Sequence, residues 1–376
     1  MSVYLDYNAS APVRPEAAAA MARALEAGGN PSSVHAAGRA ARAVVETARA
    51  DVAALVGAGP AAVTFTSGGT EADALAIDSA VLAGFERIIV GATEHEAVVE
   101  TAKASGVAVQ EWPVDGRGLA DLDWLADQLR AGPKTLVCLM LANNETGVIQ
   151  PVAEAAALVR DAGGWLHVDA VQAAGKIEID FNTLGADTLA LSAHKLGGPQ
   201  GVGALIAGER ARLTRRLHGG GQERGVRSGT ENVAGLAGFA AAARAADLDA
   251  MSAQAAWRDG LARRAAGGHA EALGEGAPRL PQTLCFATPG FASDLQVIGL
   301  DLAGVMVSAG AACSSGKVGP SHVLAAMRVP PEIAVATIRV SLGWSTTEAD
   351  IAHFIDAWTA LYRRTRGRAS ATDRAA

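Results

Sequence analysis

The chain has 376 residues, of which 50% are hydrophobic, 19% are charged and 4% are aromatic, and its formal net charge at pH 7 is -7. A chain of this length can bury a large core and is expected to divide into two domains. The negative net charge gives no reason to expect a nucleic acid or a membrane surface as a partner.

The cellular compartment is indicated by what the sequence lacks. The segment from Met1 to Tyr7 has no basic stretch followed by an apolar core, so no secretion signal is expected. No apolar run approaches the roughly 20 residues that span a bilayer. The cysteines Cys138, Cys285 and Cys313 are far apart and form no C-x-x-C pair, which argues against disulfides and against a cysteine-rich zinc site. We therefore expect a soluble cytoplasmic protein without a metal centre.

Apolar strand-like runs alternate with amphipathic helical segments between about residues 36 and 250. Such an alternation implies a largely parallel sheet with helices on both faces. The predicted strands are 62–66, 87–90, 107–112, 135–142 and 165–168, and the predicted helices are 36–56, 70–82, 96–104, 122–130, 152–162 and 232–246.

A second region begins near residue 251 and mixes strands with helices. The polar, basic end of the chain, residues 364–376, is expected to be frayed. The predicted strands are 283–287, 305–308 and 337–342, and the predicted helices are 294–302, 322–327 and 348–363.

Several motifs follow apolar runs, and the carboxyl ends of parallel strands are where ligands collect. In Ser67-Gly-Gly-Thr70, two glycines would let backbone amides approach an anion at a helix N-terminus, and Thr70 offers a hydroxyl. A tight turn with a helix cap is the competing interpretation. Asp169, at the end of the strand 165–168, has the carboxylate that a pyridoxal coenzyme needs at its ring nitrogen, and Gln172 would reach the phenolic oxygen. A simple helix cap is again the alternative.

The segment Ser192-Ala-His-Lys195 closes an apolar run and opens a glycine-rich turn. A lysine in this place can form a Schiff base with an aldehyde coenzyme, provided that burial and nearby cations keep its amine neutral. Ser192 and His194 are spaced to help hold a phosphate. The alternative is a lysine whose stem lies along the strand end with its ammonium in water.

Three further residues have side chains that could take part in catalysis or in binding. His95 follows the strand 87–90 and could stack on a coenzyme ring and move protons, or it could be a capping or surface histidine. Cys313 has only small neighbours, which suits a mobile thiol in nucleophilic attack and persulfide transport, although an incidental loop cysteine fits as well. Arg339 interrupts an apolar strand and could bind a carboxylate at two points or form a structural ion pair.

Together these motifs resemble the cysteine desulfurases, within the class V aminotransferase group of fold-type-I pyridoxal-phosphate enzymes. The resemblance covers nearly the whole chain, and many ordered motifs are a stronger signal than any single one. One departure is Ala74, where the family usually has an asparagine. The motifs are Asn30-Pro-Ser-Ser-Val-His35, Thr66-Ser-Gly-Gly-Thr-Glu71, Thr93-Glu-His-Glu-Ala97, Ala142-Asn-Asn-Glu-Thr-Gly147, His167-Val-Asp-Ala170, Ser192-Ala-His-Lys195, Gly219-Gly-Gly-Gln-Glu-Arg224 and Arg227-Ser-Gly-Thr230.

The resemblance implies a fold and a domain division. The fold is α/β, with a large domain whose mostly parallel seven-stranded sheet lies between helices, and a smaller α+β domain. The large domain, residues 15–250, would bind pyridoxal 5'-phosphate. The small domain, residues 1–14 and 251–376, would carry the catalytic cysteine loop.

The resemblance also implies a role for each motif residue. Lys195 would hold the coenzyme aldehyde, His95 would stack on its ring, and Cys313 would accept the sulfur. Asn144 and Arg339 would hold the substrate carboxylate. The remaining coenzyme contacts would be Gly69, Thr70, Asp169, Gln172, Ser192, His194 and, from the partner subunit of a homodimer, Thr230.

The activity implied is that of an L-cysteine desulfurase, which releases L-alanine and leaves a persulfide on Cys313. The sulfur would pass to an acceptor protein such as an iron–sulfur scaffold, or serve tRNA thiolation or cofactor synthesis. Two alternatives stay open. A selenocysteine lyase or sulfinate-eliminating relative would need Cys313 less, and a non-catalytic sulfur-relay scaffold would keep the fold without the reaction.

Overall fold

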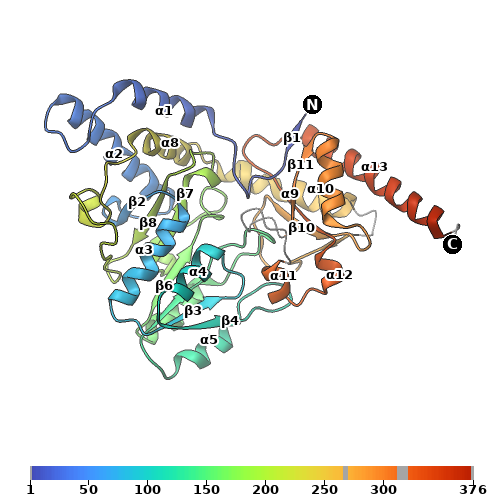
Figure 1. Cartoon of the computed structure of the whole chain (residues 1–376), viewed down its shortest axis with the longest axis horizontal. Helices are drawn as coiled ribbons and strands as arrows, with labels where there is room; N and C mark the ends of the chain where they lie inside the picture. The colour runs from blue at the N-terminus through green and yellow to red at the C-terminus, as the bar shows by residue number, and fades with distance from the viewer. Residues whose placement is uncertain (1, 266–269, 311–320, 374–376) are drawn as a thin grey trace.

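The computed structural model describes residues 2–265, 270–310 and 321–373. Its largest sheet has seven strands and lies in the left half of the view in Figure 1. The strand order is β2-β8-β7-β6-β5-β3-β4, and β8 alone runs antiparallel to its two neighbours. This confirms the predicted mostly parallel seven-stranded sheet. The strands are β2 Val63–Thr66, β3 Arg87–Gly91, β4 Ala108–Trp112, β5 Thr135–Cys138, β6 Trp165–Asp169, β7 Thr188–Ser192 and β8 Gly203–Ala207.

Helices cover both faces of this sheet. On one face, α3 (Gly69–Leu82) and α4 (Glu96–Ala104) pack over the strands, as Figure 1 shows. The other helices of this part contribute to the large core on the opposite face. They are α1 Pro15–Ala27, α2 Ala36–Leu55, α5 Leu122–Leu129, α6 Val152–Asp161, α7 Phe181–Leu184 and α8 Val233–Arg244, and short 3-10 turns occupy η1 Pro60–Ala62, η2 Ala193–Lys195 and η3 Glu223–Gly225.

The alternation of side chains along β6 decides which residues face the site. Leu166 and Val168 pack into the large core on one face, while Trp165 joins the cluster under α3 and α4 on the other. Because successive side chains of a strand point to opposite faces, His167 and Asp169 lie on the same face as Trp165. The two polar residues of β6 therefore lie under the helix that begins at Gly69.

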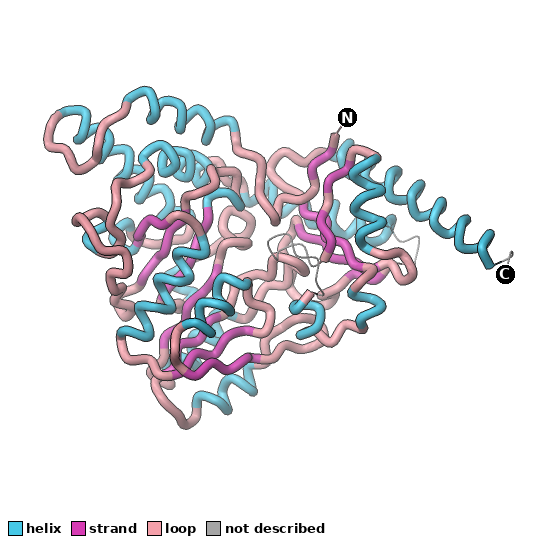
Figure 2. Tube along the Cα trace, viewed as in Figure 1, coloured by secondary structure: helices cyan, strands magenta, loops and turns pink. Residues whose placement is uncertain are grey.

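A second group of strands lies apart from the first, and Figure 2 shows the two groups separated by loops and helices. It comprises an antiparallel sheet of order β12-β13-β10-β9 and a parallel pair, β1 with β11. Its core includes the rings of Phe286, Phe354 and Trp358. The elements are β1 Val3–Tyr4, α9 Leu248–Ala265, β9 Glu271–Ala272, β10 Thr283–Ala287, α10 Ser293–Leu302, β11 Val305–Met306, β12 Ser308–Ala309, α11 His322–Ala326, α12 Pro331–Ala334, β13 Thr337–Ser341 and α13 Glu348–Asp373.

Some elements differ from the sequence prediction. The strand expected at 305–308 is two strands, because β11 pairs with β1 whereas β12 pairs with β13. The expected fraying from residue 364 is wrong as far as Asp373, where α13 ends. The elements α1, α9 and β8 were not expected. The division of the chain into domains at residues 14 and 250 stays a prediction.

The segment that follows β1 connects the two sheets. Asn8 is buried, its backbone N–H donates to Ser341 Oγ of β13 (3.0 Å), and its side-chain Nδ2 donates to the Asn144 carbonyl (3.1 Å) and to Thr283 Oγ1 (2.9 Å). The backbone of residue 8 is therefore held between β10, β13 and the loop after β5. This placement matters because its carbonyl faces Lys195.

Candidate active site

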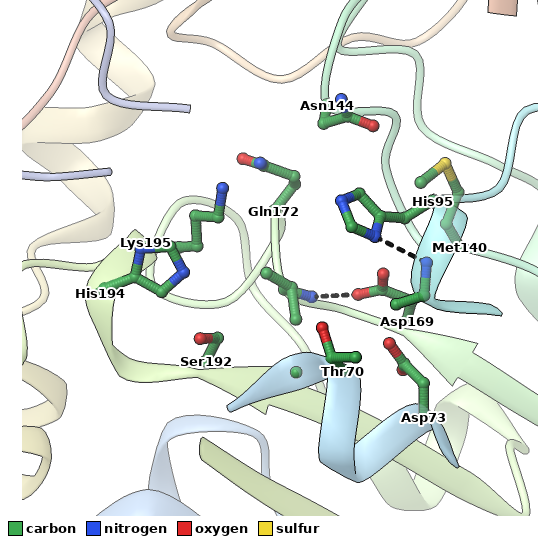
Figure 3. A pocket seen from close by; sticks show the side chains of 13 residues that line it. Thr70, Asp73, His95, Met140, Asn144, Asp169, Gln172, Ser192, His194 and Lys195 are labelled. Carbon is green, nitrogen blue, oxygen red and sulfur yellow. Dashed lines mark hydrogen bonds between the residues drawn. The ribbon is translucent and has the colours of Figure 1, made fainter. Parts of the chain in front are cut away.

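A cavity of about 720 Å³, counting the space at its open mouth, lies at the carboxyl ends of β6 and β7 (Figure 3). This is the edge at which a parallel sheet collects ligands. Most residues proposed from the sequence as coenzyme or substrate contacts converge here. The lining residues are Gly69, Thr70, Asp73, His95, Ala97, Met140, Asn144, Asp169, Val171, Gln172, Ser192, His194 and Lys195.

Glycines allow the start of α3 to approach the sheet closely. A Cβ on Gly203 of β8 would lie 2.5 Å from the carbonyl carbon of Gly68 and 2.7 Å from the Leu191 carbonyl oxygen. A Cβ on Gly69 would lie 2.8 Å from Val171 Cγ2. Real Cβ atoms do not tolerate such contacts, so only glycine permits this packing. The free N–H groups of the first turn of α3 consequently open onto the cavity, as an anion site requires.

Polar side chains surround this helix start. Thr70 is exposed, Ser192 is buried at the end of β7, and His194 follows in η2. His194 Nδ1 lies 3.2 Å from Ser10 Oγ. Burial, followed by the charge of Lys195, lowers the pKa of His194 to about 4, so its ring is neutral at pH 7. Together with the helix N-terminus, these groups can hold a phosphate.

Lys195 lies at the end of η2, directly after β7. Its Nζ donates to the carbonyl oxygens of Asn8 (2.5 Å) and Ala9 (2.9 Å), so the amine is held by the segment that connects the two sheets. In Figure 3 the amine points toward the amide of Gln172. The arrangement places a primary amine inside the cavity, as imine formation with an aldehyde requires.

Asp169 and His95 lie on the other side of the cavity (Figure 3). Asp169 Oδ1 accepts from the Val171 backbone N–H at 2.8 Å. Burial raises the pKa of Asp169 to about 6, so this carboxyl is mostly ionised at pH 7. His95 caps α4, where its Nδ1 accepts from the Ala97 N–H at 3.1 Å, and burial lowers its pKa. Its ring is thus neutral and carries its proton on Nε2.

Asn144 and Arg339, the predicted contacts of the substrate carboxylate, are placed differently. Asn144 lines the cavity, whereas Arg339 is fully buried on β13 and does not line it. The Arg339 guanidinium pairs with Asp6 Oδ1 (2.7 Å) and donates to the Asn144 carbonyl (3.0 Å) and to Ser308 Oγ (3.2 Å). The structure thus contains the ion pair that was the alternative interpretation, and the role in substrate binding stays a prediction.

Two predicted residues are not brought into the cavity. Thr230 is exposed in the segment between η3 and α8 and does not line the cavity of its own chain. Cys313 lies outside the described residues. The predictions for both residues, a partner-subunit contact and a sulfur acceptor, stay open.

Sequence reasoning missed Asp73. It lies on α3 one turn after Thr70, is 1% exposed, and its Oδ1 is 3.1 Å from His167 Nε2. Burial raises the pKa of Asp73 to about 8 and lowers that of His167 to about 4, so both are mainly neutral at pH 7. The three-residue spacing from Thr70 places both side chains on one helix face, and this signal was available in the sequence.

Glu94 is a second buried acid near Asp169. Its carboxyl accepts a hydrogen bond from the Met140 N–H, and Met140 is another lining residue that the sequence did not indicate. Burial and, next, the charge of Asp169 raise the pKa of Glu94 well above its ordinary value. Asp73 is mainly neutral at pH 7 and burial disfavours the ionised form of Glu94, so Asp169 is the carboxyl that carries negative charge at this end of the cavity.

The donor set fits pyridoxal 5'-phosphate. The helix start with its hydroxyls suits a phosphate, the ionised carboxylate of Asp169 suits a protonated ring nitrogen, and the amine of Lys195 suits an aldehyde. Among the described residues, no group of three or more His, Cys, Asp and Glu side chains is placed to hold a metal ion. In the same part of the chain, no helix combines the length and the apolar character needed to cross a membrane.

Comparison with known proteins agrees with this chemistry. The sequence profile of the family aminotransferase class-V matches residues 3–354. The chain therefore belongs to the class-V aminotransferase family, and it is a pyridoxal-phosphate-dependent enzyme.

The similar proteins indicate which reaction the enzyme catalyses. The chain is 43% identical to a cysteine desulfurase of Cereibacter sphaeroides (94% of each chain covered) and 38% identical to the cysteine desulfurase IscS of Dictyoglomus turgidum (97% and 95% covered). Among solved structures it is similar to a NifS-like protein from Rickettsia africae, with a TM-score of 0.85, 33% identity, and 96% and 100% of the two chains covered. The activity is that of a cysteine desulfurase, and the substrate of this group is L-cysteine.

Proposed function

We propose that Cys313 is the sulfur acceptor of this enzyme and that Lys195, His95 and Asp169 carry the chemistry at the coenzyme. In the net reaction, the carbon–sulfur bond of L-cysteine breaks and a sulfur–sulfur bond to Cys313 forms. The hydrogen of the Cys313 thiol ends on the carbon that lost its sulfur, which gives L-alanine. Atoms and electrons balance without an external oxidant or reductant.

Bound pyridoxal phosphate supplies an electron sink that weakens bonds around the carbon that carries the substrate amine. The chain's own residues hold and direct it. The start of α3 with Thr70, Ser192 and His194 binds the phosphate, and Asp169 keeps the ring nitrogen protonated. His95 stacks on the ring, and its Nε2 proton faces the cavity.

Lys195 has two tasks. Its amine holds the coenzyme aldehyde before substrate arrives, and afterwards its Nζ moves protons between the carbons of the substrate. The carbonyls of Asn8 and Ala9 accept hydrogen bonds from Nζ and keep the amine at the cavity when it is released. Asn144 contacts the substrate carboxylate. The observation that carries this proposal is the convergence of Lys195, His95, Asp169 and the α3 N-terminus on one cavity.

The assembly and the sulfur acceptor belong to the same proposal. We infer a homodimer in which Thr230 of one copy completes the phosphate site of the other. Thr230 is exposed and does not line the cavity of its own chain, and both observations support this inference. We further infer a cytoplasmic enzyme that passes sulfur to an acceptor protein such as an iron–sulfur scaffold. Support for this comes from the relative named IscS.

Three variants test the proposal. The purified enzyme should convert L-cysteine to L-alanine, and Lys195→Ala should lose the visible absorption of bound coenzyme. Cys313→Ala should retain that absorption but form no protein persulfide, as measured by mass spectrometry. Cys285→Ala is the matched control, because burial raises the pKa of the Cys285 thiol and makes it a poor nucleophile.

Two results would contradict the proposal. One is persulfide formation by Cys313→Ala at the rate of the unaltered enzyme, and the other is a normal visible absorption in Lys195→Ala. The mass of the particle in solution, measured by light scattering, should equal that of two chains. A single chain with full activity would refute the role of Thr230 in a partner's site.

A further inference from the structure

A second buried lysine lies behind the cavity. Lys176, in the turn between β6 and α7, is 5% exposed, and its Nζ donates to Gln172 Oε1 at 3.0 Å. Within the described part of the chain, no carboxylate forms an ion pair with it. Burial and, next, the charges of Lys195 and Arg339 lower the pKa of Lys176 well below its ordinary value. An amine buried at such a cost without a counter-charge calls for a functional explanation.

The contact with Lys176 determines how the Gln172 amide is oriented. Gln172 Oε1 accepts from Lys176, and Gln172 Nε2 donates to the Asn8 carbonyl at 2.9 Å. Turning the amide over would place its NH₂ group against the amine of Lys176 and its oxygen against the Asn8 carbonyl. The first change removes the acceptor of the Lys176 amine, and the second is a repulsive contact between two oxygens. The orientation therefore follows from the chemistry of the two neighbours.

We propose that Lys176 is a positioning residue that keeps the NH₂ group of Gln172 directed into the active site as a hydrogen-bond donor. Nε2 carries two hydrogens, and the Asn8 carbonyl takes one of them. The second is available to the phenolic oxygen of the coenzyme. This inference rests on the proposed function and on the placement of Gln172 beside that oxygen, which the sequence predicts and the lining of the cavity supports. Lys176 does not line the cavity, so it acts only through Gln172.

The proposal predicts a spectroscopic effect. A donor directed at the phenolic oxygen favours the unprotonated form of the bound coenzyme, because a hydrogen bond to the charged form stabilises that form. Without Lys176, Oε1 of Gln172 is buried without a donor, and the amide orientation is held only by the hydrogen bond from Nε2 to the Asn8 carbonyl. The NH₂ group is then less firmly directed at the coenzyme. The charged and titratable groups near Lys176 are Lys195, Arg339 and His194, and none of them replaces the lost donor.

The test is the pH titration of the visible absorption of the dimeric holoenzyme. Methionine has a similar length to lysine but no donor. In Lys176→Met the midpoint of the titration should rise by about one pH unit, because that shift corresponds to the free energy of one lost hydrogen bond. Lys103→Met is the control, because Lys103 is exposed on α4, where it pairs with Glu100. Its midpoint should equal that of the unaltered enzyme. Should Lys176→Met yield no holoenzyme, Lys176→Leu serves for the same comparison.

A double variant separates positioning from a direct effect of charge. In a Gln172→Ala background, Lys176→Met should cause no further shift, because the amide through which it acts is absent. An unchanged midpoint in Lys176→Met, or the same shift with and without Gln172, would overturn the inference. Persistence of the visible absorption in Lys195→Ala would instead refute the proposed function, so the two failures are distinguishable.

Discussion

Replacing Gly203 by alanine is expected to damage both the fold and the coenzyme site. Gly203 begins β8, where it pairs with Thr66 of β2 and with Ser192 of β7. Its backbone is not in the left-handed region, so alanine meets no conformational barrier there. The whole effect must therefore come from the contacts of the added Cβ. Those contacts, with the start of α3 and with the backbone of β7, are all shorter than 3.0 Å.

The magnitude follows from the kind of atoms involved. Backbone cannot move aside as the end of a flexible side chain can, so the cost should lie at the upper end of overpacking, about 3 kcal/mol. For 376 residues the entropy of unfolding is about 0.8 kcal/mol/K, so Tm should fall by about 4 °C. Displacing the start of α3 should also cost one hydrogen bond to phosphate. A loss of about 1.5 kcal/mol weakens coenzyme affinity roughly tenfold.

The assay is thermal unfolding of the apo-enzyme together with a coenzyme titration followed by visible absorption. Gly260→Ala is the matched control, because a Cβ there meets nothing within 4 Å. It lies in α9, where alanine should stabilise the helix by up to about 1 kcal/mol. Equal Tm and equal coenzyme affinity for Gly203→Ala and the unaltered chain would refute the close-approach argument.

Two further substitutions test buried charges. The Glu223 carboxylate accepts a hydrogen bond from Arg49 Nη1 (2.7 Å), and both side chains are under 10% exposed. Glu223→Gln should therefore cost about 3 kcal/mol of stability and lower Tm by about 4 °C. An unchanged Tm would contradict the pairing. Burial raises the pKa of Asp73 from 3.8 to about 8, so the stability that this group contributes is complete below pH 3.8 and is lost as the pH rises through 8. Asp73→Asn cannot ionise, so its free energy of unfolding relative to that of the unaltered chain should increase between pH 4 and 8, by at most about 1.4 kcal/mol per pH unit, and its relative Tm should rise with it. A constant difference across that range would show that Asp73 does not titrate there.

Much of the large sheet could be predicted because its strands are short apolar runs between helices with regular periodicity. The helix predicted at 96–104 has the bounds of α4. The strand β8 was not predicted. Its sequence, Gly203-Ala-Leu-Ile-Ala207, consists largely of small residues with weak strand propensity, and its conformation depends on pairing with β2 and β7. Such pairing is non-local, and a local pattern does not reveal it.

Some residues of the candidate site could likewise be predicted from the sequence, and others could not. Asp169 and Lys195 could be proposed because each follows an apolar run, and strand ends of a parallel sheet meet at one edge. The ion pair of Arg339 with Asp6 joins residues 333 positions apart, and no spacing in the sequence indicates it. The buried amine of Lys176 was missed for a similar reason, since its surroundings include Arg339 from a distant strand.

The position of Asn8 has a consequence for biosynthesis. The carbonyl that receives the Lys195 amine is held by Ser341 and Thr283, which leave the ribosome long after residue 195. A nascent chain that already contains β6 and β7 has the catalytic amine but not its final acceptor. Coenzyme capture in the finished geometry must therefore wait until translation has passed β13, close to the last helix.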